Sequence, residues 1–317
     1  MILALAGGVG GAKLAQGLAM RLAPKELLIV VNTGDDFVHL GLNISPDLDT
    51  VMYWLAGLND RGRGWGLAGE TWNFMDALGR IGGPTWFNLG DADLATHVVR
   101  TQMLGEGASL SAVTQALYTR LGIAHAVAPM TDAPVRTIVH TADAALAFQD
   151  YFVRLQCAPA ITSVSFAGTE AAKPSPAFAA AMANPALRAI VICPSNPLLS
   201  IDPILSIPRV QDWLRRSRIP VVAVSPIVGA EAIKGPAAKI FRELGRHVSV
   251  QGIAEHYHGL INGLVIDTMD APAKPGLEAL GLRVAVAPSV MKSVEDQAAL
   301  AAAVLGFATD LAGACHA

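Results

Sequence analysis

Short runs of consecutive apolar residues recur along the chain and predict buried β-strands. The runs cover residues 2–6, 27–31, 161–166, 189–192, 221–225, 264–266 and 284–287. Helical patterns separate most of these runs, at residues 11–21, 210–216, 237–244 and 294–307. Strands that are apolar throughout and alternate with helices are typical of parallel sheets covered on both faces. The pattern therefore predicts an α/β fold with a doubly wound, mainly parallel, Rossmann-like sheet.

The middle third of the chain breaks this alternation. Residues 92–102 and 110–121 predict two consecutive helices, and residues 126–129 and 137–140 predict two short strands. We therefore expect residues 60–160 to form an inserted, mostly helical subdomain that caps the carboxyl edge of the sheet. We expect residues 1–60 and 160–317 to form the nucleotide- and phosphate-binding core.

Composition and charge exclude several classes of partner. Of the 317 residues, 52% are hydrophobic and 15% are charged, which is ample for a buried core. The net charge of -3 provides no basic field for nucleic acid or for an anionic membrane. Mean hydropathy is +0.43, but the apolar runs are too short to span a bilayer. No leader pattern precedes the first strand, so we expect a cytoplasmic protein with small-molecule substrates.

A glycine-rich turn, Gly-Gly-Val-Gly-Gly-Ala-Lys, follows the first predicted strand. Glycines bring backbone N–H groups close to a ligand, and the helix that follows points its positive end there. We therefore expect Gly8, Gly10, Gly11 and Lys13 to bind phosphate. Neither standard nucleotide motif fits, because Lys13 replaces the third glycine of a dinucleotide site and no serine or threonine follows it. The alternatives are a turn that only permits close helix packing and a solvated Lys13.

Four carboxylates follow the second predicted strand. Asp35 and Asp36 come directly after it, and Asp47 and Asp49 come shortly afterwards. Ligands of open α/β sheets bind at the carboxyl ends of strands, and a hard divalent cation relieves such crowding of negative charge. We therefore expect a metal site here. The alternatives are that Asp47 or Asp49 caps the next helix, and that Asp35 and Asp36 lie in a solvated turn.

Two later strand ends also carry polar loops. The proline-rich loop after residues 189–192 presents Ser195 and Asn196, and the loop after residues 221–225 presents Lys234 just before a helix. We expect all three to bind the phosphate-bearing substrate. The alternative for each loop is a plain strand-to-helix connection.

Three tryptophans, Trp65, Trp72 and Trp86, lie within the predicted subdomain. They can pack against a flat heteroaromatic ligand. The alternative is that they only anchor the subdomain, because large aromatic side chains are usually buried.

Taken in order, the polar motifs resemble those of the 2-phospho-L-lactate transferase family, which acts in the biosynthesis of the deazaflavin coenzyme F-420. The resemblance runs from residue 1 to about residue 270. Its motifs are Ala-Gly-Gly-Val-Gly-Gly-Ala-Lys at 6–13, Asn-Thr-Gly-Asp-Asp at 32–36, Ser-Pro-Asp-Leu-Asp-Thr at 45–50, Leu-Gly-Asp at 89–91, Pro-Ser-Asn-Pro at 194–197 and Lys-Gly-Pro-Ala at 234–237.

The resemblance implies a reaction and a set of ligands. A GDP-activated phospho-hydroxyacid (2-phospholactyl, phosphoenolpyruvyl or 3-phosphoglyceryl) is transferred to the ribityl hydroxyl of the deazaflavin Fo, GMP leaves, and Mg2+ is required. It implies Fo contacts at Asp49 and at Asn88, where archaeal members tend to have a basic residue. We expect Asp36 and Asp49 to be catalytic, and the metal ligands to come from Asp35, Asp36, Asp47 and Asp49.

Two other functions remain compatible with the same fold. One is an NAD(P)-dependent oxidoreductase, which the missing third glycine disfavours. The other is a non-catalytic nucleotide-binding protein, for which so many polar strand ends would be superfluous. A homodimer is compatible with the sequence, which identifies no interface.

Overall fold

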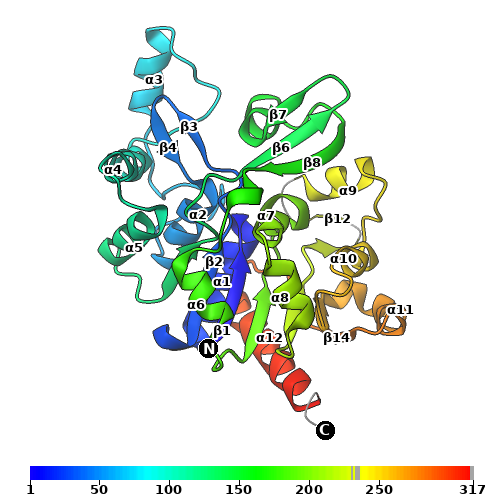
Figure 1. The fold of residues 1–317 in the computed structure, drawn as a ribbon. Helices are drawn as coiled ribbons and strands as arrows, with labels where there is room; N and C mark the ends of the chain where they lie inside the picture. The colour runs from blue at the N-terminus through cyan, green and yellow to red at the C-terminus, as the bar shows by residue number, and fades with distance from the viewer. Residues whose placement is uncertain (230, 233–235, 315–317) are drawn as a thin grey trace.

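Seven parallel strands form the central sheet of the computed structural model, which describes residues 1–229, 231–232 and 236–314 (Figure 1). The order across the sheet is β14 (Arg283–Val286), β13 (Gly263–Ile266), β10 (Val221–Val224), β9 (Ala189–Ile192), β1 (Ile2–Ala6), β2 (Leu27–Val31) and β5 (Ala126–Pro129). The predicted doubly wound, Rossmann-like fold is confirmed. The chain leaves β1 toward β2 on one side and later returns to β9 on the other, so the topological switch point lies between β1 and β9.

Alternate residues of β1 supply the two halves of the core. Ile2, Ala4 and Ala6 pack into one hydrophobic cluster, and Leu3 and Leu5 pack into the other. Successive side chains of a strand point to opposite faces, so a strand covered on both faces must be apolar at every position. This explains the continuous apolar runs of the sequence.

Helices cover both faces of the sheet. The first cluster is covered by α1 (Gly8–Arg21), α2 (Pro46–Leu55), α4 (Asp93–Gly105), α5 (Leu110–Arg120) and α12 (Val294–Ala314). The second is covered by α6 (Pro176–Met182), α7 (Asp202–Ser206), α8 (Val210–Arg216), α9 (Ala237–Glu243), α10 (Val250–His256) and α11 (Lys274–Ala279). Short helical turns complete the connections: η1 (Pro24–Glu26), η2 (Asp150–Arg154), η3 (Thr169–Ala171), η4 (Pro197–Ile201) and η5 (Thr268–Ala273).

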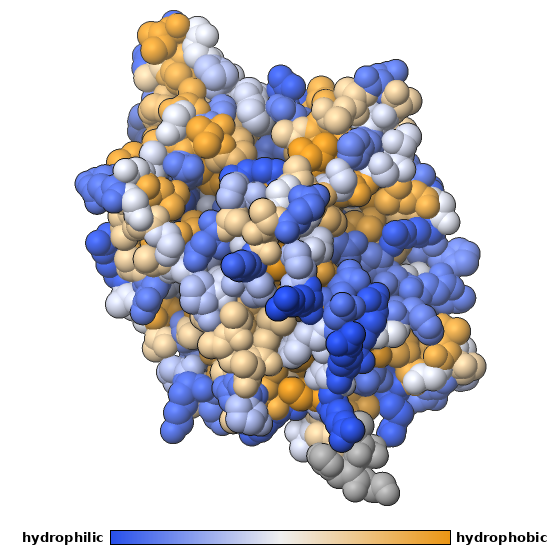
Figure 2. Space-filling view, in the orientation of Figure 1, coloured by the Kyte–Doolittle hydropathy of each residue, from blue (hydrophilic) through white to orange (hydrophobic). Residues whose placement is uncertain are grey.

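Two arms project from one end of the sheet, opposite the chain termini (Figure 1). One arm holds α3 (Asn73–Arg80) and the hairpin of β3 (Phe37–His39) and β4 (Leu42–Ile44). The other is an antiparallel sheet of β7 (Ala145–Ala147), β6 (Arg136–Thr141) and β8 (Ile161–Ala167). A further hairpin joins β11 (Ile227–Val228) to β12 (Glu231–Ala232). Figure 2 shows hydrophobic residues at the tip of the arm that holds α3. Ile81, directly after α3, is 83% exposed.

Two predictions about strands are wrong. Residues 161–166 were expected in the parallel sheet, but β8 pairs antiparallel with β6. From Ser163 onward its polar and apolar residues alternate, and Thr162, Ser163 and Ser165 are exposed, as in a strand covered on one face only. Residues 126–129 were expected in the inserted subdomain, but β5 is the edge strand of the central sheet, next to β2. The remaining division of the chain at residues 60 and 160 stays a prediction.

No helix in the described part of the chain has both the length and the apolar character needed to cross a membrane.

The contact between α1 and α12 depends on Gly17. A Cβ atom at this position would lie 2.2 Å from the backbone oxygen of Gln297 on α12. Gly17→Ala should therefore lower the free energy of unfolding by about 1–3 kcal/mol, measured by urea denaturation. Gly306→Ala is the matched control, because a Cβ there meets open space within α12 and should stabilise the helix by about 0.5–1 kcal/mol. Equal effects of the two substitutions would contradict this account of the helix packing.

Candidate functional site

A cavity of about 590 Å3 opens at the carboxyl ends of the central strands. Its floor comes from the loops that follow β1, β2, β9, β10 and β14. Parts of the segments 63–66, 87–88 and 148–153, which belong to the predicted subdomain, supply other parts of its wall. The cavity therefore lies beside the topological switch point, where α/β sheets bind their ligands.

Asn32 holds two carboxylates together in the cavity wall. Its Nδ2 donates to Asp35 Oδ1 at 3.1 Å and to Asp47 Oδ2 at 3.0 Å. Both aspartates are about 6% exposed, and both line the cavity. The carboxyl end of β2 and the first turn of α2 thus converge, as the sequence predicts.

Asp47 also lies at the N-terminus of α1. Its Oδ1 accepts a hydrogen bond of 2.7 Å from the backbone N–H of Gly8, which has a φ of 58° that favours glycine. The alternative that Asp47 or Asp49 caps its own helix is wrong, because α2 begins at Pro46 and no side chain caps it. Instead, Asp47 contributes a carboxylate to the positive end of α1.

Gly10 and Gly11 allow α1 to pack closely against the loop after β9. A Cβ at Gly10 would lie 2.2 Å from the oxygen of Pro194, and one at Gly11 would lie 2.4 Å from Ser195 Oγ. Gly8 and Gly10 line the cavity, whereas Gly11 packs behind them. Close packing thus accounts for Gly11. Gly8, which the turn requires, and Gly10, which close packing requires, also lie on the cavity wall.

Lys13 reaches the cavity from the first turns of α1. Its Nζ donates to the oxygen of Met291 at 2.6 Å and lies 5.5 Å from the centre of the Trp54 ring. These contacts hold the ammonium group in the cavity wall, so Lys13 is half-buried rather than solvated.

The electrostatics of Asp35 and Asp47 favour a bound cation. Burial raises the pKa of Asp47 to about 6, although hydrogen bonds from Asn32 and Gly8 oppose the rise. Burial, and then the charge of Asp47, raise the pKa of Asp35 well above its ordinary value. Two adjacent buried carboxylates offer the hard oxygen ligands that Mg2+ prefers, and a cation would offset their repulsion. The two residues therefore fit a divalent metal ion.

Asp36 lies away from the cavity wall. Ser45 Oγ donates to its Oδ2 at 2.8 Å, and its buried Oδ1 has no hydrogen-bond partner among the described residues. Burial raises the pKa of Asp36 to about 7. Its catalytic and metal-binding roles stay predictions, and its position behind Ser45 gives them no direct support.

The raised pKa of Asp36 predicts a pH-dependent stability. Between about pH 4 and pH 7, Asp36 is ionised in the unfolded chain but protonated in the folded chain. The free energy of unfolding therefore falls as pH rises. In buffer that contains a chelator, Asp36→Asn should raise the free energy of unfolding by about 1–3 kcal/mol near pH 8 and much less near pH 4. The exposed Asp143→Asn is the control and should have no such pH dependence. An increase in the free energy of unfolding that is the same at every pH would contradict the idea that burying the ionised Asp36 destabilises the fold.

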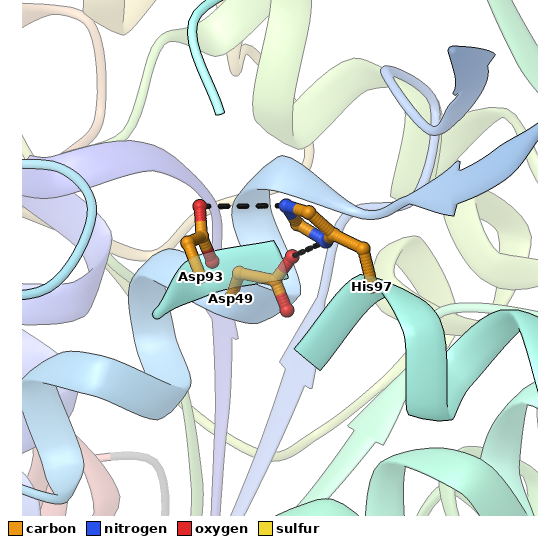
Figure 3. Close-up of side chains that lie close together, drawn as sticks. All are labelled: Asp49, Asp93 and His97. Carbon is orange, nitrogen blue, oxygen red and sulfur yellow. Dashed lines mark ion pairs between the residues drawn. The ribbon is translucent and has the colours of Figure 1, made fainter. Parts of the chain in front are cut away.

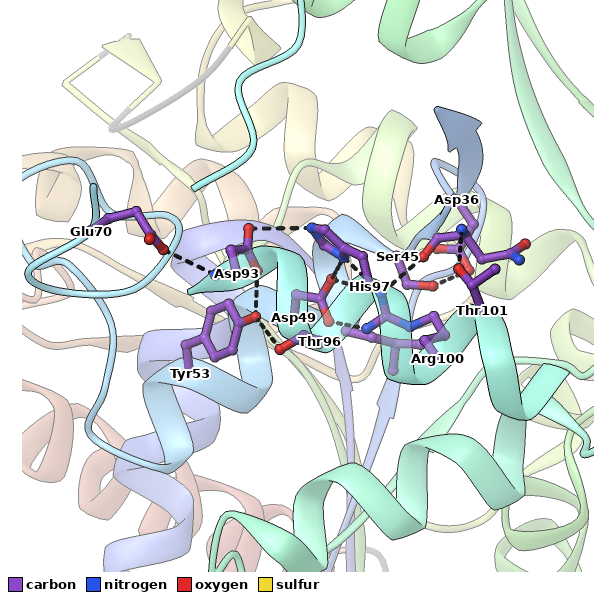
Figure 4. A network of polar contacts seen from close by, with 12 residues as sticks. Asp36, Ser45, Asp49, Tyr53, Glu70, Asp93, Thr96, His97, Arg100 and Thr101 are labelled. Atoms are coloured by element: carbon purple, nitrogen blue, oxygen red, sulfur yellow. Dashed lines mark hydrogen bonds and ion pairs between the residues drawn. The ribbon is translucent and has the colours of Figure 1, made fainter. Parts of the chain in front are cut away.

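Asp49 is paired with a buried arginine. Arg100 of α4 binds both carboxylate oxygens, Nη1 to Oδ2 at 3.1 Å and Nη2 to Oδ1 (Figure 4). Nη1 also donates to the oxygen of Asn43 at 3.2 Å. Burial raises the pKa of Asp49, and the charge of Arg100 opposes this rise. Asp49 lines the cavity, but its charge is largely neutralised, which favours a positioning or binding role over metal ligation.

Asp49, Asp93 and His97 lie close enough to suggest a second metal site, as Figure 3 shows. His97 Nδ1 lies 3.2 Å from Arg100 Nη1 and 3.6 Å from Asp49 Oδ2, and His97 Nε2 lies 3.4 Å from Asp93 Oδ2. A guanidinium group only donates, so Nδ1 must accept and the ring proton lies on Nε2. A protonated Nε2 cannot bind a metal, and the adjacent guanidinium disfavours a second cation. We therefore assign no metal to this trio.

Acidic residues of the subdomain cap helices that are distant in the sequence. Asp91 accepts hydrogen bonds from the backbone of Asn73 and Phe74 at the start of α3, and Glu70 accepts from the backbone of Ala92 and Asp93 at the start of α4. A hydrogen bond from the Thr71 hydroxyl, followed by the backbone bonds from Phe74 and Asn73, lowers the pKa of Asp91 to about 2. The two carboxylates stabilise the loops that carry the cavity wall.

Aromatic side chains line part of the cavity. Trp65, Phe87, Phe148 and Phe152 are in its wall, and the rings of Phe148 and Phe152 stack at 5.3 Å. Trp72 and Trp86 instead pack inside the α3 arm, Trp86 at 6.2 Å from Phe37, for example. The anchoring alternative therefore applies to Trp72 and Trp86, and packing of Trp65 against a flat ligand stays a prediction. Asn88 is exposed at the cavity wall.

The predicted loops contribute unequally to the site. Ser195 and Asn196 line the cavity, but their side chains have structural partners: Ser195 Oγ accepts from Gly7 N–H at 3.1 Å, and Asn196 Oδ1 accepts from Leu198 N–H at 3.0 Å. Lys234 lies outside the described residues.

Sequence reasoning missed several residues of the site, among them Asn32, His97, Arg100 and Gln149. A signal for two of them was available. On a predicted helix, His97 comes four residues after Asp93, and Arg100 comes three residues after His97, so all three share one helix face. Nothing in the sequence indicated that this face turns toward Asp49.

Known proteins resemble this chain over most of its length. The family described as 2-phospho-L-lactate transferase CofD matches residues 2–284. A phosphoenolpyruvate transferase of Streptomyces griseus is 40% identical over 98% of this chain and 99% of its own. A 2-phospho-L-lactate transferase of Methanosarcina mazei is 37% identical over 94% of this chain and 97% of its own. A member of the upf0052 family from Bacillus halodurans shares the fold, with a TM-score of 0.63 at 14% identity over 96% of this chain and 98% of its own.

Proposed function

This chain belongs to the 2-phospho-L-lactate transferase CofD family, and we propose that it transfers a phospho-hydroxyacid group from a GDP-linked donor to the ribityl hydroxyl of Fo, releasing GMP. One observation carries the proposal: the Asp35–Asp47 pair and the N-terminus of α1 meet in a single large cavity. Amide donors and paired carboxylates together suit a diphosphate and its cation. The family membership removes the oxidoreductase alternative.

The donor's diphosphate is assigned to the α1 side of the cavity. The first N–H groups of a helix have no partner within the helix, and the cavity wall there includes Gly8, Val9 and Gly10. Lys13 supplies a positive charge on the same side. Because Asp47 already occupies Gly8 N–H, a bare phosphate would meet a carboxylate there.

A divalent cation would resolve this conflict of charges. We assign Mg2+ to Asp35 and Asp47, whose carboxylates Asn32 holds together. When bound, Mg2+ would neutralise phosphate oxygens as charge develops on the leaving GMP. Asn32 holds the two carboxylates next to each other, and the backbone N–H of Gly8 fixes one oxygen of Asp47.

The acceptor is assigned to the side lined by aromatic residues. Trp65, Phe87 and the stacked Phe148 and Phe152 line the cavity, and such side chains can pack against a flat tricyclic ring. Asp49, held by Arg100, and Asn88 are the polar residues that we assign to Fo.

The transfer itself is a substitution at phosphorus. The acceptor oxygen bonds to the phosphorus that carries the hydroxyacid, and the bond from this phosphorus to the bridging oxygen breaks. GMP leaves with that oxygen, and the proton of the acceptor hydroxyl passes to the departing phosphate or to solvent. The chain's own contribution is to align donor and acceptor and to hold charge beside the phosphates, which are the main sources of rate enhancement in such reactions.

The relatives' names do not decide among donor acids, because phosphoenolpyruvate and 2-phospho-L-lactate transferases match with similar identity. The deciding experiment incubates the purified protein with Fo, Mg2+ and each GDP-linked donor in turn. We expect GMP and one F-420-type product, identified by its mass. Absence of GMP and of product with every donor would overturn the proposed function.

A further inference from the structure

A buried donor and a partly exposed acceptor lie side by side at the α4 end of the cavity. His97 is 2% exposed, lines the cavity, and its Nε2 makes no hydrogen bond within the described part of the chain. Asp93 Oδ2 lies 3.4 Å from that nitrogen (Figure 3). Asp93 is close enough for an ion pair, but the contact is not a hydrogen bond, so the buried N–H group stays unsatisfied, which is costly and calls for an explanation.

The surrounding contacts fix the direction of each group. Arg100 donates toward Nδ1, which places the ring proton on Nε2 and makes Nε2 a donor. The Tyr53 hydroxyl donates to Asp93 Oδ1 and lies 2.9 Å from Thr96 Oγ1, which fixes the Asp93 carboxylate and leaves Oδ2 facing His97 (Figure 4).

A donor and an acceptor at this separation select one type of ligand group. An alcohol oxygen can accept from His97 Nε2–H and donate to Asp93 Oδ2 at ordinary hydrogen-bond lengths. A phosphate or carboxylate oxygen has no proton to donate and would be repelled by Asp93. An ammonium group has no lone pair to accept from Nε2–H.

We propose that His97 and Asp93 together bind one hydroxyl group of the acceptor's ribityl chain. This inference rests on the proposed function and goes beyond it, because it adds two acceptor-binding residues from α4 to Asp49 and Asn88. It also fixes the direction of the acceptor, with the polyol chain at the α4 end and the donor's phosphates at the α1 end. Arg100 is a positioning residue, because it orients both His97 and Asp49.

The test compares two fluorescent probes by titration: Fo, and a deazaflavin that carries a methyl group in place of the ribityl chain. His97→Ala should weaken Fo binding about 10-fold and leave binding of the methyl analogue and of GDP unchanged. His97→Gln keeps an N–H donor and should restore most of the Fo affinity. His258→Ala, at an exposed position outside the cavity, is the control.

A second variant and two contrary outcomes make the test decisive. Asp93→Ala should also weaken binding of Fo, but not of the methyl analogue or of GDP. This variant tests the inference even if His97→Ala fails to fold. Equal losses for Fo and the methyl analogue, or no loss for Fo, would overturn the inference. If the wild-type protein binds Fo with the predicted variant effects but forms no product, the proposed function fails and this inference stands. If it does not bind Fo, both fail.

Discussion

Asp47→Asn should reduce turnover on the order of 100-fold or more while the protein remains folded. Asp47 has three partners at the centre of the site: Gly8 N–H, Asn32 Nδ2 and, in the proposal, the cation. The amide can still accept one hydrogen bond, but it has no negative charge for Mg2+. We therefore expect the loss to appear chiefly in the Mg2+ concentration required for activity.

The pH dependence distinguishes this role from a structural one. Because burial raises the pKa of Asp47 to about 6, protons compete with the cation at low pH, and the Mg2+ affinity of the wild-type protein should fall as pH decreases from about 8 to 5. Titrations of the rate with Mg2+ at several pH values measure this directly. Asp143→Asn is the matched surface control. Unchanged Mg2+ dependence in Asp47→Asn would remove Asp47 from the metal site.

Arg100→Met should lower the free energy of unfolding by about 3–5 kcal/mol near pH 8. Arg100 is 2% exposed and is the two-point partner of Asp49, so its removal leaves a buried carboxylate without its counterion. Asp49 will then take up a proton more readily, and the destabilisation should be smaller near pH 5. Urea denaturation at the two pH values measures both effects.

A surface ion pair provides the control for Arg100. Arg154 pairs with Asp150 at 3.1 Å, but the two side chains are 51% and 32% exposed, so Arg154→Met should cost no more than about 1 kcal/mol. In a double-mutant cycle, Asp49→Asn should recover part of the stability that Arg100→Met loses. Similar costs at the two arginines would mean that the Asp49–Arg100 pair contributes little to the fold.

The central sheet was predictable because its strands carry a strong signal. Strands such as β1 and β9 are apolar at every position, and only a sheet covered on both faces needs this pattern. The β8 segment was misassigned because its apolar residues outweighed the polar Thr162, Ser163 and Ser165. The sequence did not predict that β5 joins the central sheet, because pairing between strands that are distant in sequence leaves no local pattern.

Part of the site was predictable for the same reason. Asp35 follows β2 and the glycine turn follows β1, so the parallel topology brings both to one edge, and Asp47 lies in the first turn of α2, which begins at that edge. The position of His97, Arg100 and Gln149 at the site was not predictable, because it depends on how α4 and η2 pack over the sheet. Asp36 shows the opposite error: it adjoins Asp35 in sequence, but its side chain turns toward Ser45 and away from the cavity.

The central claim is that the α1 N-terminus and the Asp35–Asp47 pair hold the donor's diphosphate and a cation in the same cavity as Fo. A crystal structure of the protein with GDP, Mg2+ and Fo tests it most directly. We predict the diphosphate beside Gly8, Gly10 and Lys13, the cation on Asp35 and Asp47, and the ribityl chain near Asp49. A nucleotide bound away from the α1 N-terminus, or a cation that contacts neither Asp35 nor Asp47, would contradict the account.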